Sequence, residues 1–225
     1  MRTGTLSSKL FLVASIAILA GCATSRSEIR LSTPAAAPAA AANPSGPVAV
    51  IRTVNDDRKF GEAPSDPSVP SLGFEGAAQA SADVKSRAIG RKRNTYGKAL
   101  GDVLLESGQT VESVIRENLA AGLQQAGYQV KAEKDAPDAP LMIDVSIGKF
   151  WAWLQPGFWA IKLHTQVATD LRFNGASDAT PLALKREESL QIVTDGAWME
   201  GIGKALEAYR AAVAKAAASF PKTKQ

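Results

Sequence analysis

Residues Leu141–Trp153 read LMIDVSIGKFWAW, and the predicted fold is built around them. Apolar residues at alternate positions indicate a strand with one buried face. A second stretch of the same kind, Trp159–Phe173, follows after Pro156-Gly157. The residues that carry the two patterns are Leu141, Ile143, Val145, Ile147, Trp151 and Trp153, then Trp159, Ile161, Leu163, Val167, Leu171 and Phe173.

The two stretches predict an antiparallel hairpin whose register follows from its buried faces. A loop with an odd number of residues, such as Gln155–Gly157, pairs Trp153 with Trp159 and brings the two apolar faces to the same side. Proline at the second position of a three-residue loop is unfavourable, so a five-residue loop is the alternative.

Two amphipathic helices are predicted on either side of this hairpin. Thr110 is a helix cap, and apolar residues recur at helical spacing until Gly127 ends the first helix. The second helix begins at Thr194 or Asp195 and runs towards Phe220.

The remaining segments predict further strands at 47–54, 102–106, 128–130 and 182–193, and a long loop over 59–82. We therefore expect one α+β domain over 47–221: a two-layer sandwich of a mainly antiparallel sheet with both helices on one face. Residues 222–225 form a tail.

The beginning of the chain carries a second strong pattern. Arg2 and Lys9 precede the apolar run Leu10–Ala20, which ends in Leu19-Ala20-Gly21-Cys22. The run is shorter than the roughly 20 residues of a membrane-spanning helix, so it is typical of a secretory signal. The ending resembles a bacterial lipobox. That resemblance implies removal of residues 1–21 and lipid attachment to Cys22, the only cysteine.

Residues 22–46 are rich in alanine and proline, and they predict a tether between the lipid and the domain. At roughly 3 Å per residue such a tether would hold the domain tens of ångströms from the membrane. The formal charge of +4 at pH 7 is a mild excess and does not indicate nucleic-acid binding. A single histidine argues against a His-rich metal site, and no cofactor motif is present.

Taken together, these features resemble the YajG-like family of bacterial envelope lipoproteins over about 47–210. Trp151, Trp153 and Trp159 are not part of the family's pattern, and the segment 59–84 is longer here. The resemblance implies an envelope location, a small α/β domain and no catalytic residues. It rests on the lipobox at Cys22, Asp56-Asp57-Arg58, Ile89-Gly90, Tyr96-Gly97 and the helix Val111–Ala126 with its ending Gly127–Val130.

A basic segment and a group of tryptophans are the candidate binding sites. The basic residues are Lys85, Arg87, Arg91, Lys92, Arg93 and Lys98, which form either a site for anionic headgroups or an acidic partner, or an exposed charged loop. Trp151, Trp153 and Trp159 lie near one hairpin tip, where they either pack under a helix or form an interaction patch.

Two further candidates have simpler interpretations. His164 falls on the polar face of its strand, opposite Gly148 in the predicted register, so we expect a solvated residue without a catalytic role. Asp56 and Asp57 could bind a cation, but with Arg58 beside them we expect a solvated turn with a local ion pair.

The sequence thus predicts a non-enzymatic accessory or binding lipoprotein, joined to the membrane by its lipid and serving an envelope protein or the cell wall. Ala23 follows the cysteine, and the absence of aspartate there favours the outer membrane, with the domain facing the periplasm. The alternative is a periplasmic hydrolase of an envelope substrate. No nucleophile or metal motif supports that alternative.

Overall fold

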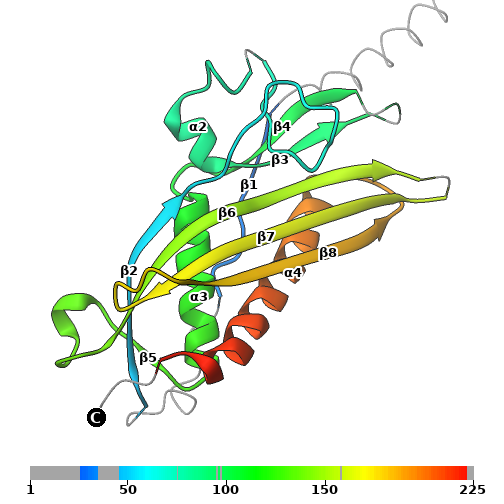
Figure 1. The fold of residues 1–225 in the computed structure, drawn as a ribbon. Coiled ribbons are helices and arrows are strands. Elements are labelled where there is room, and N and C mark those ends of the chain that lie inside the picture. Colours follow the sequence, from blue (N-terminus) through cyan, green and yellow to red (C-terminus); the bar gives the residue numbers. More distant parts are fainter. Residues whose placement is uncertain are drawn as a thin grey trace, which may run out of the picture.

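The computed structural model describes residues 26–34, 46–74, 76–94, 96, 98–157 and 159–221. These residues form one mixed α/β body (Figure 1). The strands are β1 (Ser27–Ile29), β2 (Val48–Asp56), β3 (Ala88–Arg93), β4 (Ala99–Leu105), β5 (Gln129–Val130), β6 (Leu141–Pro156), β7 (Ile161–Phe173) and β8 (Ala179–Leu190). The helices are α2 (Ala82–Arg87), α3 (Val111–Gln125) and α4 (Asp195–Ala216), with short 3₁₀ turns η1 (Glu133–Asp135) and η2 (Ala217–Ser219).

Strand β6 is the centre of the eight-stranded sheet. Along one edge it pairs antiparallel with β7, which in turn pairs with β8. The other edge is divided between two parallel partners: β2 beside Leu141–Ile147, and β3 beside Ala152 and Trp153. Beyond β2 lies β5, and beyond β3 lie β4 and β1, so the sheet forks.

The prediction of a mainly antiparallel sheet is therefore wrong, because the sheet is mixed. Strand β2 and its partner β6 are separated in sequence by α3, and such a crossover permits parallel pairing. Alternation shows which face of a strand is buried, but it carries no information on the direction of the neighbouring strand.

Both long helices form where the sequence predicts them. The Thr110 Oγ1 accepts a hydrogen bond from the Ser113 amide, and the Ser113 hydroxyl accepts one from the Thr110 amide. Thr194 caps α4 in the same manner through the Ala197 amide. Gly127, with φ of +89°, ends α3 in the left-handed region that favours glycine. The two helices pack together on one face of the sheet (Figure 1).

A bulge at Gly148 changes the predicted hairpin. Ile147 pairs with Thr169, but Lys149 already pairs with Ala168, so one residue of β6 is left without a partner. The extra residue exchanges the two faces of β6. Trp153 consequently pairs with His164 instead of Trp159, and Gly157, Trp159 and Ala160 lie in the loop between β6 and β7.

The sheet has a core on both faces because of this exchange. Before the bulge Ile143 and Val145 face α3 and α4; after it, Phe150 and Ala152 do so. The tryptophans Trp151 and Trp153 turn to the opposite face and form a second core with Leu72, Ala77, Ala88 and Leu104. Residues 59–81, which we call the cover segment, supply part of this second core. The two-layer prediction is thus incomplete, since this part of the sheet has a third layer.

The domain also begins earlier than predicted. Residues Ser27–Ile29, assigned to the tether, pair in parallel with Val103–Leu105 of β4. Ile29 and Leu31 are buried in the main core. Ser27-Glu28-Ile29 is too short, with one β-branched residue, to be recognised as a strand from the sequence, and only its pairing with β4 reveals it. Residues 35–45, the alanine-rich part of the expected tether, lie outside the described residues, as do 222–225.

Arg58 fills the fork between β2 and β3. Its side chain is fully buried, and its guanidinium holds both carboxylate oxygens of Asp56 at 2.7 Å. It also donates to the carbonyl oxygens of Phe150 at 3.0 Å, Lys85 at 2.8 Å and Ala88. The predicted ion pair with Asp56 therefore exists, but the predicted solvated turn is wrong, because Arg58 joins β2, α2, β3 and β6.

We expect Arg58→Ala to lower the free energy of unfolding by about 3–5 kcal/mol, because it leaves three carbonyl oxygens and a carboxylate without their buried partner. Urea unfolding of the two proteins would measure the difference. Lys59→Ala, at the exposed neighbouring position, is the control and should change stability by less than about 0.5 kcal/mol. Equal effects of the two substitutions would contradict the role of Arg58.

The tryptophans provide a matched test of the second core. Trp151 is 1% exposed and Trp159 is 85% exposed. Trp151→Ala should cost about 3–5 kcal/mol of unfolding free energy, since it opens a large cavity. Trp159→Ala should cost less than about 0.5 kcal/mol. If Trp151→Ala were as mild as Trp159→Ala, the assignment of Trp151 to a core would be wrong.

Candidate binding surface

The basic segment is not one continuous patch, because its side chains belong to different elements. Arg87, at the end of α2, binds Asp83 at 2.9 Å and Glu28 at 3.0 Å, and donates to the Leu105 carbonyl. These hydrogen bonds raise the pKa of Arg87, and the bond to Asp83 contributes most. Arg87 therefore joins α2 to the β1–β4 pair and is not available to a ligand. Lys85, earlier in α2, is half-buried.

Asp102 organises the surface where the described chain begins. Its side chain is fully buried in β4 and accepts the Gly73 amide at 2.7 Å and Arg26 Nε at 3.1 Å. Arg91 Nε lies 3.9 Å from the same carboxylate. Arg26 also lies over the ring of Phe74, 4.3 Å from its centroid. Asp102 thus holds the cover segment through Gly73, and it holds Arg26, the residue that precedes β1. The sequence placed Asp102 at the start of a strand and gave no sign of this role.

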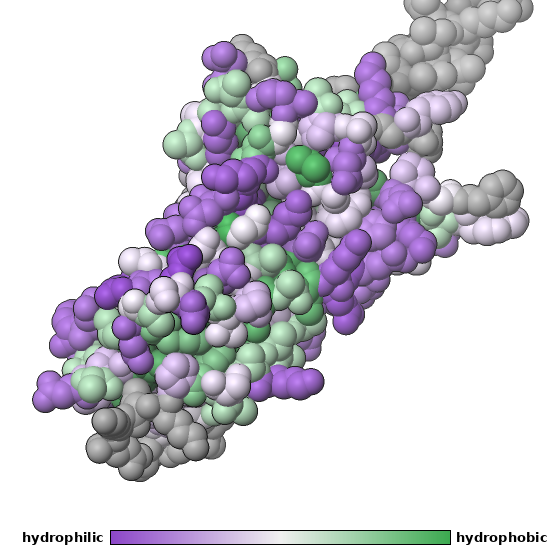
Figure 2. Space-filling model, viewed as in Figure 1, coloured by the Kyte–Doolittle hydropathy of each residue, from purple (hydrophilic) through white to green (hydrophobic). Residues whose placement is uncertain are grey.

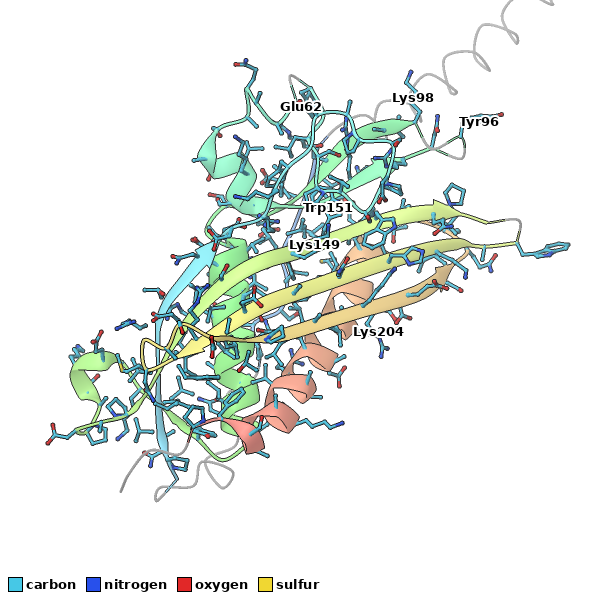
Figure 3. All side chains as sticks on the ribbon, viewed as in Figure 1. Glu62, Tyr96, Lys98, Lys149, Trp151 and Lys204 are labelled. Carbon is cyan, nitrogen blue, oxygen red and sulfur yellow. The ribbon has the colours of Figure 1, made fainter. Side chains whose placement is uncertain are left out.

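Two cations lie half-buried beside the cover segment. Arg93 Nη2 donates to the Pro64 carbonyl at 3.4 Å, and Trp151 Nε1 donates to the Pro67 carbonyl at 3.1 Å. Burial lowers the pKa of Arg93 and of Lys149, and Asp66 partly opposes the effect in both. Lys149 and Trp151 come from the same stretch of β6 (Figure 3). Among the six basic residues of the predicted segment, only Lys98 is exposed, and it lies immediately before β4.

A hollow of about 350 Å³ lies between Arg26 and the cover segment. Its lining combines the Arg26 guanidinium and the Phe74 ring with small residues before and within α2. The complete lining is Arg26, Phe74, Gly76, Gln79, Ala80, Ser81 and Val84. A cationic group beside an aromatic ring suits an anionic ligand with an apolar part.

His164 is buried, contrary to its predicted exposure. It is 7% exposed and stacks on Trp153, with ring centroids 5.1 Å apart and planes at 13°. Its Nδ1 lies 3.5 Å from Glu187 Oε2, and neither ring nitrogen has a hydrogen-bond partner in the described part of the chain. The predicted neighbour Gly148 is not opposite His164, because the bulge changes the register. Figure 2 shows many hydrophilic residues over the part of β7 and β8 nearest the β6–β7 loop.

The burial of His164 makes stability depend on pH. Desolvation lowers the pKa of His164 below its usual 6.5, although Glu187 opposes the effect; Lys185 and Lys162 add to it. The unfolded chain therefore takes up a proton before the folded one does. Stability is retained above the unfolded pKa and is lost as pH falls through the folded pKa.

We expect His164→Leu to reduce the loss of stability between about pH 7 and about pH 5, since this variant has no imidazole to protonate. Urea unfolding at several pH values would measure the two slopes. Lys162→Ala keeps His164 and serves as the control, because it should retain most of the wild-type slope. An unchanged slope in His164→Leu would contradict the assignment.

Trp159 is separated from the two buried tryptophans. It lies in the loop between β6 and β7 and is 85% exposed, whereas Trp151 and Trp153 belong to the second core. The predicted three-tryptophan patch is therefore wrong. The alternative, packing in a core, holds for Trp151 and Trp153, which lie under the cover segment instead of a helix.

The predicted cation site at Asp56 and Asp57 is taken up by contacts within the protein. Asp57 accepts a hydrogen bond from the Ser146 hydroxyl, and Asp56 binds Arg58. The described residues contain no group of three or more acidic, histidine or cysteine side chains suited to a metal.

No family model and no curated protein matches the chain. Among solved structures, it is similar to protein XCC0632 from Xanthomonas campestris, of the DUF330 family, with a TM-score of 0.44 and 10% identity over 87% of this chain and 97% of that one. A second structure, titled only as an uncharacterized protein, has a TM-score of 0.40 and 10% identity over 88% of this chain and 99% of that chain.

In the described residues, no helix has both the length and the apolar character needed to cross a membrane.

Proposed function

We propose that this chain is a lipid-anchored protein of the bacterial cell envelope that works as a non-enzymatic accessory or binding module. The observation that carries the proposal is Leu19-Ala20-Gly21-Cys22 at the end of a short apolar run. Only three residues separate Cys22 from Arg26, which is already held by the buried Asp102. A lipid on Cys22 would thus keep the domain close to the membrane surface. The YajG-like resemblance and an outer-membrane location facing the periplasm are part of this proposal.

The binding role is supported by polar and aromatic groups beside the point of attachment. The hollow between Arg26 and the cover segment offers a cation, a ring and a concave surface. Arg26 is held there by Asp102, and its side chain is 34% exposed, so its guanidinium is oriented and still accessible. An envelope protein or cell-wall component with an anionic group would suit such a surface.

The alternative function, a periplasmic hydrolase, is favoured by one contact. His164 Nδ1 lies 3.5 Å from Glu187 Oε2, and a carboxylate beside an imidazole is an arrangement used in acid–base catalysis. Against it, no hydroxyl is hydrogen-bonded to the imidazole among the described residues. His164→Leu distinguishes the two functions, because a folded variant that loses its function in cells would favour the hydrolase.

We expect radiolabelled palmitate to be incorporated into the wild-type protein and not into Cys22→Ala, because the thiol is the acceptor of the lipid. Immunoprecipitation after growth with the label would measure it. Equal labelling of the two proteins would refute lipidation at Cys22. Sucrose-gradient separation of the membranes should then place the wild type in the outer-membrane fraction, and an inner-membrane density would refute that location. Affinity purification from solubilised envelopes, with the lipoprotein as bait, would identify the partner.

A further inference from the structure

Most of the exposed large apolar side chains in the described residues lie at one end of the domain. Five large apolar residues are exposed in the described part of the chain: Phe74 at 64%, Tyr96 at 94%, Trp159 at 85%, Ile192 at 73% and Met199 at 39%. Tyr96 lies in the loop between β3 and β4, and Trp159 in the loop between β6 and β7. The tips of these two hairpins define that end of the domain.

The two hairpin tips point the same way because β3 and β6 are parallel. Gly90 pairs with Ala152 and Arg91 with Trp153, so the ends of both strands leave the sheet together (Figure 1). Ile192 follows β8, whose last residue, Leu190, pairs with Ile161 at the β6–β7 tip. Met199 lies in the first turns of α4, two residues before Gly201. Gly201 packs against Leu163 near the start of β7. The sheet register therefore brings Tyr96, Trp159, Ile192 and Met199 to one end, which we call the tip end.

The described chain begins on the side of the same tip end. Strand β1 is parallel to β4, with Ser27 beside Val103, so the residues before Ser27 lead towards the beginning of β4 and the Tyr96 loop. Phe74 lies against Arg26, the first described residue. From Arg26, the chain back to Cys22 can reach at most about 14 Å. A lipid on Cys22 is thus held within a short distance of the exposed aromatic residues.

The charge of the tips suits an anionic surface. Residues 88–101 and 149–162, which contain the two tips, include cations and no aspartate or glutamate. Of those cations, Lys98 and Lys162 are exposed, whereas Arg91, Lys92, Arg93 and Lys149 are half-buried and Arg91 lies 3.9 Å from the buried Asp102 carboxylate. Two nearby carboxylates are in ion pairs: Glu187 with Lys162 at 2.6 Å and Glu200 with Lys204 at 2.8 Å. Figure 3 shows Tyr96 and Lys98 close together at this end.

We propose that the tip end docks onto the bilayer that carries the lipid anchor, with Trp159 and Tyr96 in the interface and Lys98 on anionic phospholipid headgroups. Tryptophan and tyrosine favour the headgroup region, where an apolar ring meets water. A diacylglycerol on Cys22, the lipid that a lipobox implies, brings two acyl chains that hold the chain to the bilayer, and the aromatic rings would then fix which end of the domain faces it. The inference rests on the proposed lipid anchor. It adds an orientation: β6, β7 and β8 stand with their hairpin end on the membrane.

The chain is convenient for a direct test because Cys22 is its only cysteine. Once Cys22 is acylated, Ala160→Cys supplies a single thiol for a polarity-sensitive fluorophore, next to Trp159 and without replacing it. Ser177→Cys is the matched control: it is exposed in the turn after β7, whose 13 residues place it roughly 40 Å away. The labelled full-length mature lipoproteins are reconstituted in phosphatidylcholine vesicles, with or without phosphatidylglycerol.

We expect the Ala160→Cys probe to emit at shorter wavelength and to be quenched by lipids spin-labelled near the headgroup, more so with phosphatidylglycerol. The Ser177→Cys probe should remain in water. Adding Trp159→Ala and Tyr96→Ala to the Ala160→Cys protein should abolish the shift. Lys98→Gln should lower the ratio of docked to undocked probe roughly five-fold, as expected for one cation at an anionic surface.

Mass spectrometry of the Cys22 peptide from the same samples separates the two proposals. An acylated Cys22 with both probes in water would overturn the docking and leave the anchor intact. An unmodified Cys22 in protein purified from bacterial membranes would overturn the anchor itself and, with it, the basis of the docking. A shift of the Ala160→Cys probe that grows with protein density and not with phosphatidylglycerol would overturn the docking in favour of a second copy of the chain.

Discussion

The guanidinium of Arg58 holds together the place where the sheet divides. Strand β2 leaves β6 after Ile147, and β3 joins β6 only at Ala152. Between these points the edge of β6 has backbone groups without a strand partner, and Arg58 supplies donors to the Phe150 and Ala88 carbonyl oxygens. A buried carbonyl without a partner costs free energy comparable to a lost hydrogen bond. Asp56 balances the buried charge with a two-point contact, so a short polar turn after β2 becomes the junction of the sheet.

The bulge at Gly148 lies at the same junction and has an effect over the whole domain. It exchanges the faces of β6, so that one long strand contributes to both cores. The helices α3 and α4 cover the face with Phe150 and Ala152, whereas the cover segment lies over Trp151 and Trp153. His164 is buried for the same reason, since the new register places it beside the Trp153 ring. One unpaired residue thus determines where two tryptophans and the only histidine lie.

The arrangement of parallel and antiparallel strands determines what the surface can do. Parallel pairing of β1 with β4 directs the beginning of the domain towards the β3–β4 loop, and parallel pairing of β3 with β6 brings the two hairpin loops to one end. The buried carboxylate of Asp102 adds the Arg26 and Phe74 pair beside them. The ion pairs of Arg58, Arg87 and Arg91 stabilise elements, whereas Lys98 and the rings of Tyr96 and Trp159 are exposed on the surface. The candidate binding surface is therefore a product of topology more than of the basic segment that the sequence suggested.

The sequence by itself determined the local elements: the capped helices α3 and α4, the alternating strand β7, and the left-handed end of α3 at Gly127. These depend on periodicity and on hydrogen bonds between residues three or four positions apart, which a sequence displays directly. The ending Leu19-Ala20-Gly21-Cys22, which resembles a lipobox, is also a sequence pattern, and it lies outside the described residues.

Contacts between distant segments decided the rest. The parallel partners of β6, the strand Ser27–Ile29 and the burial of Asp102 all join residues far apart in the chain, and no local pattern records such a pairing. In the sequence, Gly148 is the only sign of the bulge. Trp151 and Trp153 follow the same alternation as the residues of the main core, but after the bulge they face the second core. The sequence could show that these side chains avoid water. Which layer received them depended on one residue of β6 having no partner in β7.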